Sequence, residues 1–145
     1  LITNTPEPYA YLGLPMFGDD YPDTGPLGGI YTAIRHARNP HVLIVACDMP
    51  WLNRSLLEYQ VSLRETADIV VPRWDKFPEP LHAVYSQACL EPIREKLAAG
   101  MLKITAFFGR VSVRFVDRPE IERFDPQGRS FINVNTPDDL AEQQR

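Results

Sequence analysis

The sequence predicts an α/β domain layered around a mainly parallel sheet, and two observations support this fold class. Residues 42–47 and 68–72 are short, mostly apolar runs that end at or shortly before a proline, as in strands buried on both faces of a sheet. Segments with apolar residues at helical spacing lie before, between and after these runs. Strands that alternate with helices are typical of a layered α/β domain.

The composition is that of an ordinary globular chain. With 145 residues, 44% of them hydrophobic, and a net charge of −4, it suits a single domain over residues 1–145. The mild acidity argues against a nucleic-acid partner, and no apolar run approaches the ~20 residues that cross a membrane. Cys47 and Cys89 lie in segments predicted to be buried and lack the spacing of a zinc site, which fits a reducing cytoplasm.

The first part of the chain predicts a helix that is entered from a glycine-rich loop. Residues 1–4 look like the end of a strand, so we expect the domain to lack its first strand and helix. A helical turn with its loop at 5–15 and a brief strand at 15–17 come next. Residues 19–29 then lead into a helix that Asp23 or Thr24 can cap, with Pro26 in the first turn.

The rest of the chain alternates strands with helices. The expected strands are 42–47, 68–72, 81–85, 111–116, whose alternation suits an edge, and 131–134. The expected helices are 53–65, 88–99, 101–108 and one that opens at 136–139, and residues 73–80 and 120–129 are expected to be loops.

Asp48 is the most informative candidate for a functional residue. It follows the apolar run 42–47 directly, and open α/β sheets bind their ligands at the carboxyl ends of such strands. A carboxylate there can hold a hard cation such as Mg²⁺ against a nucleotide phosphate. The alternative is structural, because Asp48 or Asn53 can cap the helix that follows.

Three segments together resemble one protein family. GPLGGI at 25–30, CDMP at 47–50 and FINVNTPDDL at 131–140 are similar, in order and spacing, to the molybdenum cofactor guanylyltransferases, the MobA-like nucleotidyltransferases. The match extends through ADIVVP at 67–72 and EPLHAVYS at 79–86. The resemblance implies a Rossmann-like three-layer α/β/α nucleotidyltransferase fold. It also implies Mg²⁺-dependent transfer of GMP from GTP to molybdopterin, with release of pyrophosphate.

The resemblance assigns roles to single residues. Asp48 matches the catalytic aspartate that binds Mg²⁺. The implied nucleotide-binding residues are Asn4, Asp19, Gly25, Pro26, Leu27, Gly28 and Asp48, and Asp20 is an alternative match for Asp19. The implied second-substrate residues are Pro80, His82, Asn133 and Asn135. The implied partners are GTP and molybdopterin as substrates, together with a molybdenum-insertion protein and acceptor molybdoenzymes.

Some of these residues also have simpler interpretations. Asp19 and Asp20 can be turn formers, and His82 can be a core or edge-strand residue. Asn135 can be a turn or cap residue before Thr136.

One departure from the family pattern concerns the phosphates. A glycine-rich signature similar to L-A-G-G-x-S-x-R-M-G-x-D-K should stand before residue 1 and is absent from these 145 residues. Its backbone donors, Arg and Lys hold the triphosphate in the family. We therefore expect the full protein to be an enzyme and this chain alone to be inactive or nearly so. Alternatives are a related transferase that uses CTP or a sugar phosphate, and a degenerate nucleotide-binding domain without catalysis.

Overall fold

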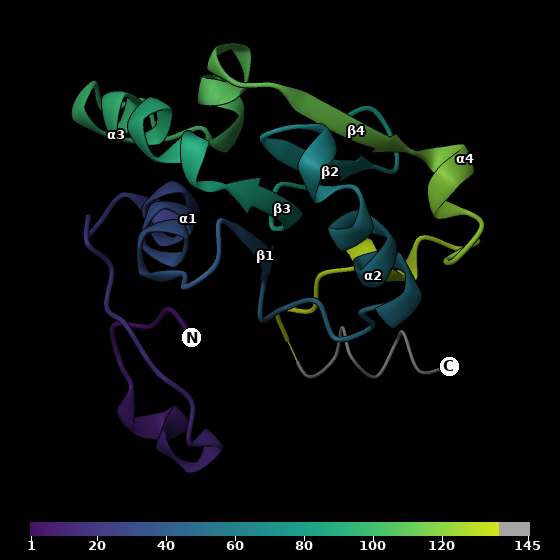
Figure 1. Ribbon diagram of the computed structural model, residues 1–145. Coiled ribbons are helices and arrows are strands. Elements are labelled where there is room, and N and C mark those ends of the chain that lie inside the picture. The colour runs from purple at the N-terminus through teal and green to yellow at the C-terminus, as the bar shows by residue number, and fades with distance from the viewer. Residues whose placement is uncertain (137–145) are drawn as a thin grey trace.

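Four strands form one mixed sheet at the centre of the molecule (Figure 1). The computed structural model describes residues 1–136. The strands are β1 (His41–Val45), β2 (Ile69–Arg73), β3 (His82–Ser86) and β4 (Val113–Asp117), and their order in the sheet is β1-β3-β2-β4. Because β3 is antiparallel to β1 and β2, and β4 is parallel to β2, the strands β1, β2 and β4 point the same way. The predicted α/β class is confirmed, and β3 is the strand that departs from the parallel direction.

The short connection between β2 and β3 explains why β3 runs the other way. Residues 74–81 join the two strands and hold no helix. A parallel connection needs a crossover of a dozen or more residues, so this segment can only reverse the chain.

Helices cover both faces of the sheet and give the expected three layers. On one face, α1 (Gly25–His36) and α3 (Leu90–Ala98) enclose a core that includes Val71, Tyr85 and Phe107. On the other face, α2 (Arg54–Ser62) and α4 (Arg118–Ile121) enclose a second core that includes Val70 and Val84. Alternate residues of β2 and β3 therefore enter opposite cores, as the pleat of a strand requires.

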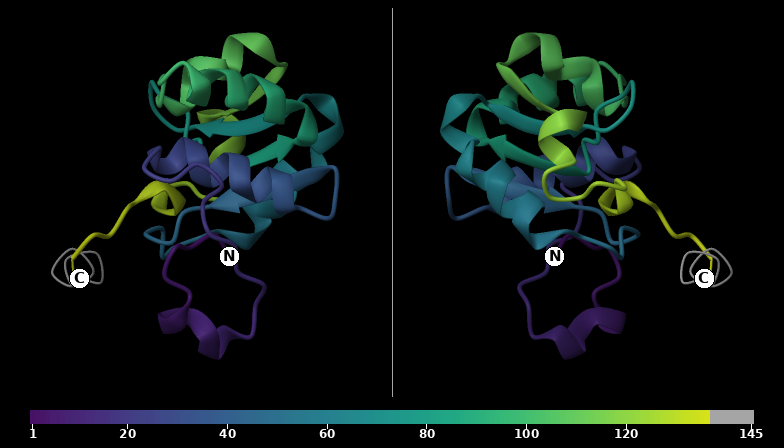
Figure 2. Two further views of the ribbon diagram at one scale, coloured as in Figure 1. Left: turned by 90° about the vertical axis from the view of Figure 1, so that its left-hand side faces the viewer. Right: turned by 90° about the vertical axis from the view of Figure 1, so that its right-hand side faces the viewer.

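Five short 3₁₀ helices complete the described chain. They are η1 (Glu7–Leu12), η2 (Arg64–Thr66), η3 (Gln87–Cys89), η4 (Ile104–Arg110) and η5 (Arg129–Phe131). The helical segments predicted at 5–15, 53–65, 88–99 and 101–108 correspond to η1, to α2 with η2, to η3 with α3, and to η4. Both views of Figure 2 show the segment around η1 projecting away from the layered body. At its base, Ile2 and Phe17 form one parallel bridge, which is all that forms of the brief strand expected at 15–17.

The structure corrects several expectations. The sequence predicts that the strand after residue 40 is buried on both faces, but β1 pairs with β3 alone in the described chain. Its first four residues are half-buried and Val45 is exposed. Cys47, which follows it, is exposed, whereas Cys89 is buried as expected. Residues 131–134 are not a strand, because the backbone there closes the 3₁₀ turn of η5 instead of pairing with the sheet. The segment predicted as a loop at 120–129 begins inside α4.

Two further expectations concern the chain's end and membranes. The helix predicted to open at 136–139 lies almost wholly outside the described residues. Within residues 1–136, no helix has the length and apolar character needed to span a bilayer.

A tight turn fastens the loop after β2 to the segment before η5. Gly128 has a left-handed backbone with φ of 64°, and the Trp74 ring lies directly against its Cα. The Arg118 guanidinium lies 4.4 Å from the centre of the same indole ring. Trp74 therefore links the 74–81 loop, α4 and the 125–131 turn.

Gly128→Ala is expected to destabilise the fold strongly, because a Cβ there would lie 2.3 Å from Trp74 Cε2. Gly100 is a matched control: its φ of 67° carries the same conformational cost, but nothing lies within 4 Å of its added Cβ. We expect urea unfolding to show a loss of about 3 kcal/mol for Gly128→Ala and about 1 kcal/mol for Gly100→Ala. Equal losses would mean that the Trp74 contact does not constrain the turn.

Candidate functional site

A cavity of about 830 Å³ lies along β1 and around the residues that follow it. This volume is within the range of small-molecule sites in proteins. Most of the wall is apolar and comes from β1, from α1 and from residues 1–2. Its polar side chains are Asp19, His36, Cys47, Asp48 and Asn135, and Gly25 and Pro26 lie beside them. The cavity therefore gathers five of the predicted site residues from four separate parts of the chain.

The cap role considered for Asp48 belongs to Asn53 instead. Asn53 Oδ1 accepts a hydrogen bond of 3.0 Å from the Leu56 N–H at the start of α2. Asn53 Nδ2 also donates to the carbonyl of Phe124. Asp48 Oδ1 is buried, with no hydrogen-bond partner among residues 1–136. The carboxylate of Asp48 is therefore not used by the helix and remains available to a ligand.

Asp19 and Asp20, the two alternative matches for one nucleotide-binding residue, have different surroundings in the structure. Asp19 lines the cavity, and its Oδ2 accepts a 3.0 Å hydrogen bond from Asn4 Nδ2. Asn4 Oδ1 in turn accepts from the Asp19 N–H at 2.7 Å. Asp19 Oδ1 is buried and lacks a partner among the described residues. Asn4 thus holds Asp19 through two hydrogen bonds, one to its carboxylate and one from its backbone N–H.

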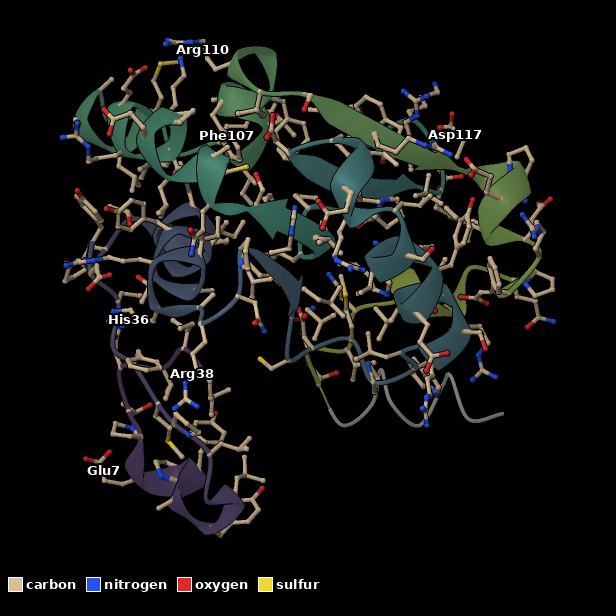
Figure 3. All side chains as sticks on the ribbon, in the orientation of Figure 1. Glu7, His36, Arg38, Phe107, Arg110 and Asp117 are labelled. Atoms are coloured by element: carbon tan, nitrogen blue, oxygen red, sulfur yellow. The ribbon has the colours of Figure 1, made fainter. Side chains whose placement is uncertain are left out.

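Asp20 is turned toward α1 and away from the cavity. Its Oδ2 lies 3.3 Å from an Arg35 nitrogen and 3.4 Å from His36 Nε2. Its N–H donates to Thr32 Oγ1, inside α1. In Figure 3, His36 lies at the end of α1 nearest the projecting N-terminal segment, which carries Glu7. Asp20 therefore joins this segment to α1, and Asp19 is the one of the two acids that lines the cavity.

The glycine-rich start of α1 divides between cavity and core. Gly25 and Pro26, which the sequence predicts to bind the nucleotide, line the cavity, and so does Gly29, which the sequence analysis does not single out. Leu27 and Gly28 are buried and do not line it. A Cβ on Gly28 would lie 2.1 Å from Thr24 Oγ1, so this glycine lets the preceding loop pack against the helix. Leu27 and Gly28 therefore lie behind the cavity wall, and their predicted nucleotide contacts stay predictions.

The segment after η5 contributes to the cavity through its backbone and one side chain. The Val134 N–H donates a 2.8 Å hydrogen bond to the carbonyl of Asp48. Asn135 lines the cavity, whereas Asn133 is exposed and does not. The structure thus brings Asn135 to Asp48 and leaves Asn133 outside.

Pro80 and His82, the other two residues predicted to contact the second substrate, do not line this cavity. Pro80 lines a separate hollow of about 610 Å³, together with Phe77 and Phe108. Next to it, burial and then the charge of Asp75 raise the pKa of Glu79. His82 has no exposed surface and belongs to the second core, so its side chain cannot touch a substrate in this conformation.

The charges around the cavity favour a cation. Asp19 and Asp48 each present a buried carboxylate oxygen without a hydrogen-bond donor among residues 1–136. The part of the wall that the structure describes contains no lysine or arginine. Within the described chain, no group of three or more His, Cys, Asp or Glu side chains gathers around a common point. Two carboxylates suit Mg²⁺, which keeps several waters and binds substrate phosphates for its other ligands.

Residues 1–112 match the MobA-like NTP transferase domain. The chain belongs to this family. The MobA-like assignment accounts for the three-layer architecture and for a cavity at the end of β1, where such sheets bind ligands.

The curated relatives and solved structures agree with the family. A protein of Clostridium perfringens strain 13, named probable molybdenum cofactor guanylyltransferase, is 34% identical over 98% of this chain and 73% of its own length. The molybdenum cofactor guanylyltransferase of Syntrophotalea carbinolica is 31% identical over the whole chain and 70% of its own length. The crystal structure of molybdopterin-guanine dinucleotide biosynthesis protein A from Archaeoglobus fulgidus superimposes with a TM-score of 0.82, at 27% identity, over 97% of this chain and 74% of that one.

If the two orphaned oxygens form one cation site, both acids should contribute to binding. We expect Asp19→Asn and Asp48→Asn each to weaken Mn²⁺ binding at least about tenfold, measured by electron paramagnetic resonance. Asp20→Asn is the control, because Asp20 pairs with Arg35 and His36, and its affinity should stay within about twofold of the wild type. An Asp20 effect as large as that of Asp48 would contradict the site.

Proposed function

We propose that the protein transfers GMP from GTP to molybdopterin, forming molybdopterin guanine dinucleotide and releasing pyrophosphate. The observation that carries the proposal is the 34% identity, over nearly the whole chain, to a relative named as a molybdenum cofactor guanylyltransferase. The cavity supports it, since Asp19, Asp48 and the start of α1 line one space of suitable volume. The relatives do not favour the alternatives of CTP, a sugar phosphate or a non-catalytic domain.

The reaction asks for positioning and charge stabilisation rather than for a strong base. A phosphate oxygen of molybdopterin attacks the α-phosphorus of GTP, and the bond from that phosphorus to the bridging oxygen of pyrophosphate breaks. The attacking group is already an anion, so no side chain has to remove a proton from it. Gly25 and Gly29 let the nucleotide approach the backbone of α1 closely, because neither carries a side chain.

We propose Mg²⁺ as the cofactor and Asp48, supported by Asp19, as the residues that hold it. Bound Mg²⁺ would supply positive charge that offsets two approaching phosphates and stabilises the leaving pyrophosphate. Asn4 fixes the Asp19 carboxylate, and the Val134 N–H fixes the backbone of Asp48. Asn135 lies where it can contact the second substrate, and we retain Asn133 and Pro80 as weaker candidates for that role.

We further propose that these 145 residues alone have little or no activity. The acids of the described cavity face the phosphates without a lysine or arginine in its wall. Of the two cations near the loop after β2, Arg73 already pairs with Asp117 at 2.8 Å, and Lys76 is exposed and does not line the cavity. We propose that the protein works in the cytoplasm, since both of its thiols are free and this suits a reducing compartment. The protein partners that this function would require are a molybdenum-insertion protein and molybdoenzymes.

The protein translated from the complete reading frame provides the test of the reaction. Incubated with molybdopterin, Mg²⁺ and each nucleoside triphosphate in turn, it should release pyrophosphate with GTP and at least about tenfold more slowly with CTP. The 145-residue chain, tested beside it, should release little. Turnover with CTP but not with GTP would overturn the proposed donor, and full activity of the short chain would overturn its proposed inactivity.

A further inference from the structure

A group of buried polar side chains lies in the second core, away from the cavity. Gln60 on α2, His82 on β3 and Ser130 on η5 have no exposed surface. Four of their polar atoms, Gln60 Oε1, His82 Nδ1, His82 Nε2 and Ser130 Oγ, lack a hydrogen-bond partner among residues 1–136. Buried polar atoms are rarely left unpaired in proteins, because each costs about 1–3 kcal/mol.

Gln60 contacts His82 directly, and Asp125 and Phe131 relate His82 to the turn that contains Ser130. Gln60 Nε2 donates a 2.8 Å hydrogen bond to the His82 carbonyl. The His82 ring packs edge-on against Phe131, with 5.1 Å between the ring centres. The carboxylate of Asp125 accepts the N–H of Ser130 at 2.7 Å and also acts on the charge of His82. Polar atoms grouped in this way are the setting in which internal water is found in proteins.

The same group borders the segment that reaches the cavity. Phe131 is the last residue of η5, and three residues later the Val134 N–H is bonded to the carbonyl of Asp48. Asn135 follows and lines the cavity. Phe131 therefore attaches residues 132–135 to the second core at one end, and the Val134 N–H attaches them to Asp48.

We propose that His82 is a positioning residue. Internal water joins its ring nitrogens to Gln60 and Ser130, and this network holds the 125–131 turn in place. The turn in turn maintains the hydrogen bond between Val134 and Asp48. The importance of His82 for catalysis rests on the proposed function, whereas its effect on the Val134–Asp48 contact can be measured without any turnover.

Two substitutions separate this role from simple packing. His82→Phe keeps an aromatic ring against Phe131 but removes both nitrogens, whereas His82→Gln keeps a polar atom at a similar reach. Amide hydrogen exchange of Val134, corrected for intrinsic rates, should lose about tenfold protection in His82→Phe and stay within about threefold of the wild type in His82→Gln. Leu97→Ala in the other core is the control, and it should lower global stability without a selective loss at Val134.

The pH dependence of this protection provides a second test, because a buried site disfavours the charged form of the His82 imidazole. Burial lowers the pKa of His82, and this outweighs the opposing effects of its own backbone and of Asp125. When the turn opens, the His82 imidazole regains its ordinary pKa of about 6.5 and takes up a proton below that pH. Protection of the Val134 N–H should therefore be complete above about pH 6.5 and should fall as the pH drops below it. In His82→Gln this dependence should disappear.

Glu79, whose carbonyl accepts the His82 N–H, carries the other half-buried carboxyl group near His82 in the chain, and burial raises its pKa. The charged groups on β1, α2 and η5 lie away from the His82 ring or are paired. His41 is at the opposite end of β1, since Val45 and not His41 pairs with His82. Arg54 and Glu58 on α2 form an exposed ion pair with each other, and Arg129 lies over the Trp51 ring.

Protection at Val134 that is unchanged in His82→Phe, or lost equally in both His82 variants, would overturn the positioning role. If the protection changes as expected while the complete protein does not use GTP, the proposed function fails and the positioning role stands.

Discussion

The candidate site depends on two buried carboxylate oxygens of the cavity wall, Asp19 Oδ1 and Asp48 Oδ1, which have no hydrogen-bond donor among residues 1–136. Each of these oxygens costs free energy while it stays buried without a donor. A protein gains nothing in stability from this arrangement. A bound cation would offset this cost, so the two acids indicate a candidate cation site.

The two acids stay available because other residues cap the helices and form the structural hydrogen bonds around them. Asn53 caps α2, so Asp48 does not have to. Asp20 pairs with the end of α1, and Asn4 orients Asp19 through both ends of its amide. The buried group around His82 would act from the opposite side, by holding the segment that bonds to the backbone of Asp48.

The sequence predicted the α/β class, β2, β3, β4 and most helices, because apolar periodicity and proline or glycine breaks are local signals. It did not predict that β1 would be half-buried, since burial depends on what packs beside a strand. The strand expected at 131–134 failed for a similar reason, because apolar residues there serve η5 and the second core. Asp19, Asp48, Gly25, Pro26 and Asn135, to which the family resemblance assigned roles, line one cavity. The burial of Leu27, Gly28 and His82 was visible only in three dimensions.

Turnover of the complete protein with Asp48 changed to Asn tests the central claim most directly. The substitution keeps the shape of the side chain and removes its charge, and Asp20→Asn provides the comparison for loss of a nearby acid. The account predicts that pyrophosphate release from GTP and molybdopterin falls by about 10²–10³-fold in Asp48→Asn, with the folded state intact. Turnover within a few-fold of the wild type would contradict it.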